Sequence, residues 1–142
     1  MSHIKILLEV IRSDGAKDTG SIWATREGDA YRIDNVPFYA RSLAYGDVVH
    51  AVPDRDGALT FTGVSQPSGH STVRLWFADA QSVQRVREEL RSMGCPSELD
   101  LDRLVAVDIP PTVPYSDVRA YLEKNERLGV FEYEEGCLGQ TA

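Results

Sequence analysis

Apolar and polar residues alternate through much of the first half of the chain, which is the pattern of strands with one buried face. One such face consists of Ile4, Ile6, Leu8 and Val10. Two pairs of short apolar runs flank turn-forming residues at 27–29 and 54–57, so each pair predicts a hairpin. Residues 72–77 also alternate and predict a further strand, which brings the total to about six strands with short turns. We therefore expect a meander or a small barrel over residues 1–68.

The apolar period changes near Gly69, from every second residue to every third or fourth. In the segment that follows, one helical face consists of Val83, Val86, Leu90 and Met93. Asp79 suits the N-cap, because its carboxylate can accept the free amides of the first turn. Gly94 suits the left-handed position that follows a helix. We expect a helix between these two residues.

A second helix is expected between Thr112 and Gly129, with Val118, Tyr121 and Leu122 on its inner face. Strands at 104–109 and 130–133 flank it, and residues 98–101 offer a short extra strand. From Ser71 onward the order is strand, helix, strand, helix, strand. That order is compatible with a ferredoxin-like split βαβ plait over residues 69–138, packed on the strand-rich half.

The two halves are expected to form a single compact α+β domain over residues 1–142. The stretch from Gln66 to Gly69 is the only plausible boundary, and it is short. Two subdomains that share a core are favoured over two independent domains. The large aromatic residues assigned to the core are Trp23, Phe61, Trp76 and Phe77.

Charge is unevenly distributed along the chain, whose net charge is −7. Residues 78–142 hold 13 Asp and Glu against 7 Lys and Arg. An acidic half repels phosphate backbones, so binding to nucleic acid is not expected. The acidity either keeps the protein soluble or attracts a basic protein partner. No apolar run approaches the roughly 18 residues of a membrane span, and no signal peptide is evident, so we expect a cytoplasmic protein without a membrane partner.

The acidic residues Glu98, Asp100 and Asp102 recur at period two and are expected on one face of a strand. They are candidates for the surface that binds a basic partner. The alternative is a solvated edge that discourages pairing with another strand.

The sequence offers little for metal or cofactor chemistry. Cys95 and Cys137 are the only cysteines, and they form no CxxC or Cys/His cluster, so we expect reduced thiols and no zinc. Residues 54–57 begin like a calcium loop but lack the glutamate at its twelfth position. A phosphate loop, a dinucleotide fingerprint and a nucleophile elbow are also missing. No metal and no cofactor are therefore predicted.

The bend at residues 34–39 is a candidate binding site. Asn35, Phe38 and Tyr39 could line a pocket or a partner surface, because an amide and aromatic side chains suit recognition. The structural interpretation is that Asp and Asn bond their own backbone in such bends, while Pro37 fixes φ. Both interpretations stay open at this point.

Asp47 and His70 are the remaining candidates. Gly46 and Asp47 can simply turn the chain, or Asp47 can act as an acid beside Asn35. His70 and Ser71 resemble a base and its nucleophile, but neighbouring residues of a strand point to opposite faces. An orienting acid would have to come from elsewhere, for example Asp47. No catalytic residue is assigned, and His70 is kept as a binding candidate.

Several motifs resemble those of the bacterial domain of unknown function 4265, over the chain from about Glu9 to Leu138. They occur in the family's order and lie at residues 21–24, 31–40, 43–49, 69–74 and 131–138. The resemblance implies a bacterial cytosolic protein and nothing about a reaction.

Two functions remain after these observations. The favoured one is a non-enzymatic interaction or accessory protein, for example of the immunity type, whose acidic face binds a basic partner protein. The alternative is a small enzyme or ligand-binding domain with a pocket formed by Asn35, Phe38, Asp47 and His70. Convergence of these four side chains on one cleft would discriminate between the two.

Overall fold

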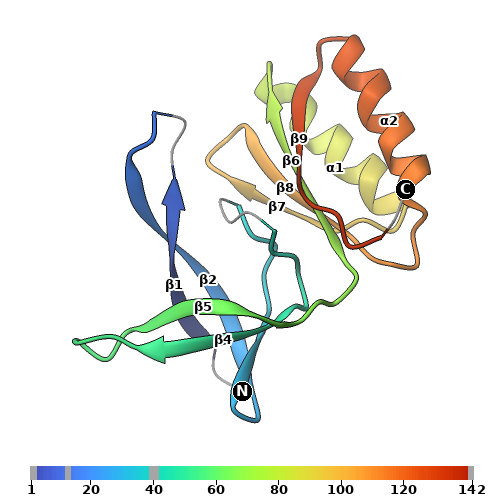
Figure 1. The fold of residues 1–142 in the computed structure, drawn as a ribbon. Coiled ribbons are helices and arrows are strands. Elements are labelled where there is room, and N and C mark those ends of the chain that lie inside the picture. Colours follow the sequence, from blue (N-terminus) through green and yellow to red (C-terminus); the bar gives the residue numbers. More distant parts are fainter. Residues whose placement is uncertain (1–2, 12–13, 39–41, 141–142) are drawn as a thin grey trace.

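The computed structural model describes residues 3–11, 14–38 and 42–140. The described chain consists mostly of strands, which form a barrel and a second sheet with predominantly antiparallel pairing, and of two helices (Figure 1). Tyr39 lies outside the described residues. No described helix is long and apolar enough to cross a membrane.

The first half closes into a barrel of five strands. They are β1 (Ile4–Ile11), β2 (Lys17–Glu27), β3 (Ala30–Ile33), β4 (Val48–Pro53) and β5 (Leu59–Gln66). Successive strands pair antiparallel, and a short parallel pairing of Ile6 and Leu7 with Leu59 and Thr60 closes the barrel. The predicted strand-rich first half is confirmed, because alternating side chains fill the barrel interior.

The second half is a four-stranded sheet with two helices on one face (Figure 1). Its strands are β6 (Ser71–Phe77), β7 (Ser97–Asp100), β8 (Leu104–Ile109) and β9 (Phe131–Cys137), in the order β7-β8-β6-β9. All pairings between these strands are antiparallel. The edge strands are therefore β7 and β9.

The helices follow their predicted signals with small shifts. Asp79 accepts a hydrogen bond from the amide of Gln81, but the first turn is the 3₁₀-helix η1 (Ala80–Ser82) and α1 spans Val83–Ser92. Gly94 takes the predicted left-handed conformation, at φ +95°. Helix α2 spans Tyr115–Arg127 and begins after Pro114, close to the start predicted at Thr112 or a nearby residue.

The buried apolar side chains form two clusters, where the sequence predicted a shared core. The barrel cluster contains Ile6, Leu8, Ile22, Ala24, Tyr31, Ile33, Leu43 and Val49. The other lies between the sheet and the helices and contains, among others, Val73, Leu75, Val86, Leu90, Val105, Val107, Val118 and Leu122. Each half of the chain thus has its own interior.

Two of the predicted core aromatics are exposed. Trp23 retains 44% of its accessible surface and Trp76 retains 42%. Trp23 lies between the buried Ile22 and Ala24, so the strand alternation turns it outward. Trp76 lies between Leu75 and Phe77, which face the helices, and it therefore points to the helix-free face. Their assignment to the core is wrong, whereas Phe77 is buried and Phe61 is partly buried.

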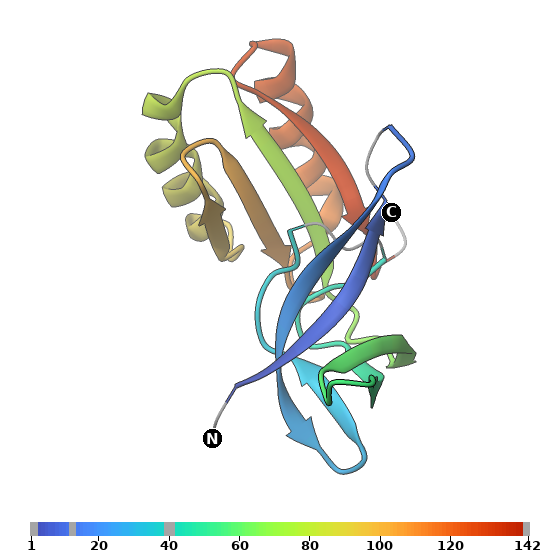
Figure 2. The ribbon, with the colours of Figure 1, turned by 90° about the vertical axis from the view of Figure 1, so that its left-hand side faces the viewer.

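The chain between β3 and β4 joins the halves. Its residues 34–38 and 42–47 pack against the helix-free face of the second sheet (Figures 1 and 2). The amide of Val36 donates to Glu98 Oε2 at 2.6 Å, and the amide of Ser42 donates to the carbonyl of Gly136 at 3.0 Å. Thr72 Oγ1 donates to the carbonyl of Leu43 at 3.1 Å. We call residues 34–38 and 42–47 the connecting segment; it covers the part of the sheet that lies near the barrel.

Candidate functional site

Two places collect polar and aromatic side chains. One, which we call the junction site, consists of Tyr45, Ser68, His70 and Asp108, where the barrel meets the second sheet. The other, which we call the Trp76 groove, lies at the far end of that sheet. Its lining consists of Trp76, Phe77, Ala78, Glu126, Gly129, Phe131, Glu132 and Tyr133.

A histidine and a buried acid form the centre of the junction site. His70 Nδ1 lies 2.8 Å from Asp108 Oδ1, and the Asp108 side chain is only 6% exposed. Burial raises the pKa of the Asp108 carboxyl, and the hydrogen bond and charge of His70 oppose that rise. The Tyr45 ring packs beside His70, with 5.5 Å between ring centroids. Burial raises the pKa of the Tyr45 hydroxyl, and Asp34 and Asp108 add to the effect.

Asp108 is a site residue that sequence reasoning missed. From the sequence, Asp47 was an example of an acid that could orient His70. The available signal was the position of Asp108 within the otherwise apolar strand Leu104–Ile109, because an isolated carboxylate in a buried strand needs a partner. His70 and Asp108 are 38 positions apart along the chain, so the sequence did not show that they are partners.

Two of the other predicted pocket residues, Asp47 and Asn35, accept hydrogen bonds from backbone amides. Asp47 is 3% exposed, and its carboxylate accepts the amides of Ala44 at 3.0 Å and Ser68 at 2.8 Å. Asn35 Oδ1 accepts the amide of Trp23 at 2.9 Å. A pocket of about 310 Å³ beside Tyr45 is lined by His70, but Asn35, Phe38 and Asp47 do not line it. The four side chains therefore do not converge on this cleft.

Ser71 is not placed to act as a nucleophile. Its side chain is fully buried, and its Oγ accepts the amide of Gly139 at 3.0 Å. The hydroxyl thus anchors the end of the chain against β6. Within the described residues, no group of three or more His, Cys, Asp or Glu could hold a metal ion.

The Trp76 groove starts from one row of residues across the sheet. Asp100 pairs with Leu104, Leu104 with Trp76, and Trp76 with Glu132. Directly opposed residues of antiparallel strands share a face, so this row lies on the helix-free side. The connecting segment covers the neighbouring rows, which leaves Trp76 accessible at the end of the sheet.

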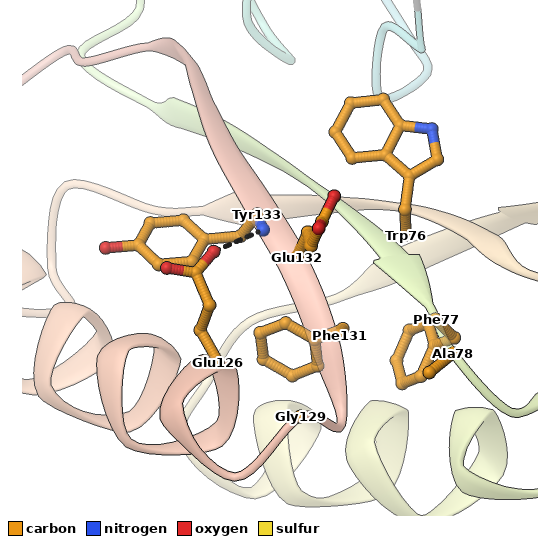
Figure 3. A pocket seen from close by; sticks show the side chains of 8 residues that line it. All are labelled: Trp76, Phe77, Ala78, Glu126, Gly129, Phe131, Glu132 and Tyr133. Carbon is orange, nitrogen blue, oxygen red and sulfur yellow. Dashed lines mark hydrogen bonds between the residues drawn. The ribbon is translucent and has the colours of Figure 1, made fainter.

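The groove continues around the edge of the sheet at β9 and has a volume of about 750 Å³. In Figure 3, Trp76 and Glu132 project on one side of the strands, while Phe77 and Phe131 project toward the helices. The latter two rings meet edge to face at 5.4 Å. Glu126 reaches over from α2 and accepts the amide of Tyr133 at 3.0 Å (Figure 3).

The helix-free face carries several carboxylates, of which only some were predicted from the sequence. Glu98 and Asp100 share this face of β7, whereas Asp102 falls in the turn after the strand. The period-two pattern stops at Asp100, because Leu101 takes a positive φ of 57° and ends the strand. Two further carboxylates, Glu132 and Glu134 of β9, lie on this face and were missed.

The sequence profile described as "Domain of unknown function (DUF4265)" matches residues 20–133. The chain belongs to this family. The solved structure of a hypothetical protein from Neisseria gonorrhoeae shares the DUF4265 chain's fold, with a TM-score of 0.88. The two are 19% identical in sequence, and the likeness covers 99% of each chain. No protein of curated function matches the DUF4265 chain.

Proposed function

We propose that this DUF4265 protein is a non-enzymatic interaction or accessory protein that binds a basic segment of a partner protein at the Trp76 groove. The exposed Trp76 among carboxylates is the observation that carries this proposal. Arg74 is the only Lys or Arg among the described strand positions of the helix-free face. It is 4% exposed, and its Nε lies 2.9 Å from Glu134 Oε1. The accessible charge at these described strand positions is thus negative.

The chemistry of the groove suits an arginine or lysine side chain. A cation over an indole ring gains about 0.5–2 kcal/mol, depending on how far water is excluded. Glu132, which is paired with Trp76 across the strands, supplies a carboxylate beside that ring. Tryptophan is also among the residue types that dominate binding energy at protein interfaces.

The finer expectations from the sequence belong to this proposal. The strand order β7-β8-β6-β9, with both helices on one face, supports a ferredoxin-like assignment for residues 69–138. A protein of the immunity type, which occludes a basic site on a toxin, is one concrete form of the function. The cytoplasmic location and the exclusion of nucleic acid and membrane as partners are proposed on composition and charge.

Tryptophan fluorescence tests the proposal directly. In a W23F variant Trp76 is the only tryptophan. We expect an arginine-rich peptide to change its emission saturably and with an affinity that falls as salt rises, because exposed charges are screened. The matched W76F variant, which keeps Trp23, should show no saturable change. Equal responses from the two variants, or no response from W23F, would refute the proposal.

The junction site favours a second function, the binding or conversion of a small ligand. Asp108 holds His70 beside the pocket of about 310 Å³. Within the described part of the chain, no residue forms a hydrogen bond with His70 Nε2. A small-molecule screen that follows the ring signals of His70 by NMR tests this function. Signals that never shift would leave His70 a purely structural role.

A further inference from the structure

Strand β9 has one unpaired side. Within the described residues, β9 pairs only with β6 and forms an edge of the sheet. The Trp76 groove follows this edge past Gly129, Phe131 and Tyr133. Near the other end of β9, the amide of Ser42 engages the carbonyl of Gly136, so the accessible part of the edge begins at Phe131.

A side chain occupies the bonding position that a neighbouring strand would use. The amide of Tyr133 donates to Glu126 Oε2 at 3.0 Å, so it points away from β6. Backbone groups alternate along a strand, and Phe131, two residues earlier, therefore has the same orientation. Glu126 belongs to α2 and its hydrogen bond is exposed. Within the described residues, an exposed side-chain contact thus occupies this edge instead of a β-ladder.

The groove specifies the charge of an occupant. Its lining includes the carboxylates of Glu126 and Glu132, and the cation beside it is Arg103, whose Nη1 donates to the carbonyl of Ala78 at 3.2 Å. Glu134, the next residue of β9 on the side of Glu132, has a side chain that is 53% exposed. An extended segment with Lys or Arg at every second position would place its cations beside Glu132, Glu134 and the Trp76 ring.

We propose that a basic, extended segment of the partner protein pairs with β9 as an additional strand and displaces the Glu126 carboxylate from the Tyr133 amide. Main-chain hydrogen bonds then contribute affinity, and alternate side chains contribute specificity. This inference rests on the proposed function, because it states how the basic partner binds the Trp76 groove.

Substitution of Glu126 distinguishes strand addition from binding by charge attraction alone. We use a peptide of alternating arginine and threonine, with Trp76 fluorescence in the W23F background as the readout. If the peptide replaces Glu126 at the Tyr133 amide, E126A should bind it roughly two- to tenfold more tightly, because a competing hydrogen bond is gone. The matched E132A variant loses the same charge and should bind roughly two- to fivefold more weakly.

A second experiment measures the binding of N-methylated peptides to the W23F protein, which retains Glu126. Methyl groups on alternate amides that would face β9 should abolish binding, whereas methyl groups on the other amides should not. Weaker binding to E126A together with full binding of both methylated peptides would overturn strand addition and leave the proposed function intact. If no arginine peptide changes Trp76 emission, both ideas fail.

Discussion

Asp108 is the residue at which burial and charge oppose each other most clearly. Its carboxyl is buried on a central strand, and burial raises its pKa despite the neighbouring His70. A carboxyl with a raised pKa in the folded state holds its proton more tightly there than in the unfolded chain. Its contribution to the free energy of unfolding is therefore present at low pH and lost as pH rises through the folded-state pKa.

Substitution of Asp108 by asparagine tests this pH dependence of the free energy of unfolding. The free energy of unfolding of the unchanged protein, minus that of D108N, should fall as pH rises above the ordinary aspartate pKa of about 4. Urea unfolding at several pH values measures the difference. D102N, a change in an exposed turn, serves as the control and should show no comparable trend. A difference that stays constant or grows with pH would contradict the assignment.

At the scale of residues, the sequence offered His70 as a binding candidate but did not reveal its partner Asp108. A histidine at the entry to a strand is visible in the sequence, and so is an acid inside an apolar strand. Their pairing depends on β6 lying beside β8, which is a property of the sheet order. Asp47 was the nearer candidate along the chain, but the amides of Ala44 and Ser68 occupy its carboxylate.

Among the elements, the end of the chain packs closely against the start of β6. A Cβ atom at Gly139 would lie 2.3 Å from the carbonyl oxygen of His70, and backbone atoms cannot move aside as a flexible side chain can. Gly139 also donates to the buried hydroxyl of Ser71. Because Gly139 has no side chain, its backbone can lie directly against the start of β6.

Replacement of Gly139 by alanine should destabilise the protein by about 1–3 kcal/mol, which is the usual cost of overpacking. Thermal unfolding measures the effect as a lower Tm. Gly63 in β5 provides the control, because a Cβ atom there meets nothing within 4 Å. G63A should leave the Tm nearly unchanged. Equal Tm values for G139A and G63A would show that the chain end does not pack as described.

Strand faces were easier to predict than their surroundings. The alternation of Val73, Leu75 and Phe77 with the residues between them identified two faces of β6 correctly. It did not reveal which large residue on the second face would remain exposed, because both helices happen to cover only the first. Trp76 was therefore assigned to the core on its size and hydrophobicity alone.

At the scale of the whole molecule, the link between the two interiors could not be predicted from side-chain patterns. The connecting segment uses the amides of Val36 and Ser42 and the carbonyls of Pro37 and Leu43. Every residue except proline carries both groups, so composition and periodicity cannot predict these hydrogen bonds. The hydrophobic pattern, which predicted one shared core, records apolar contacts only.

The position of the connecting segment also determines how the protein can be handled. This segment blocks the sheet on the side of the barrel, whereas the open edge at Phe131 lies at the far end. In both ribbon views, the start of β1 is remote from that edge (Figures 1 and 2). Attachment of the chain to a sensor surface through its first residues would therefore leave the groove directed into solution, so that tethering does not obstruct a captured peptide.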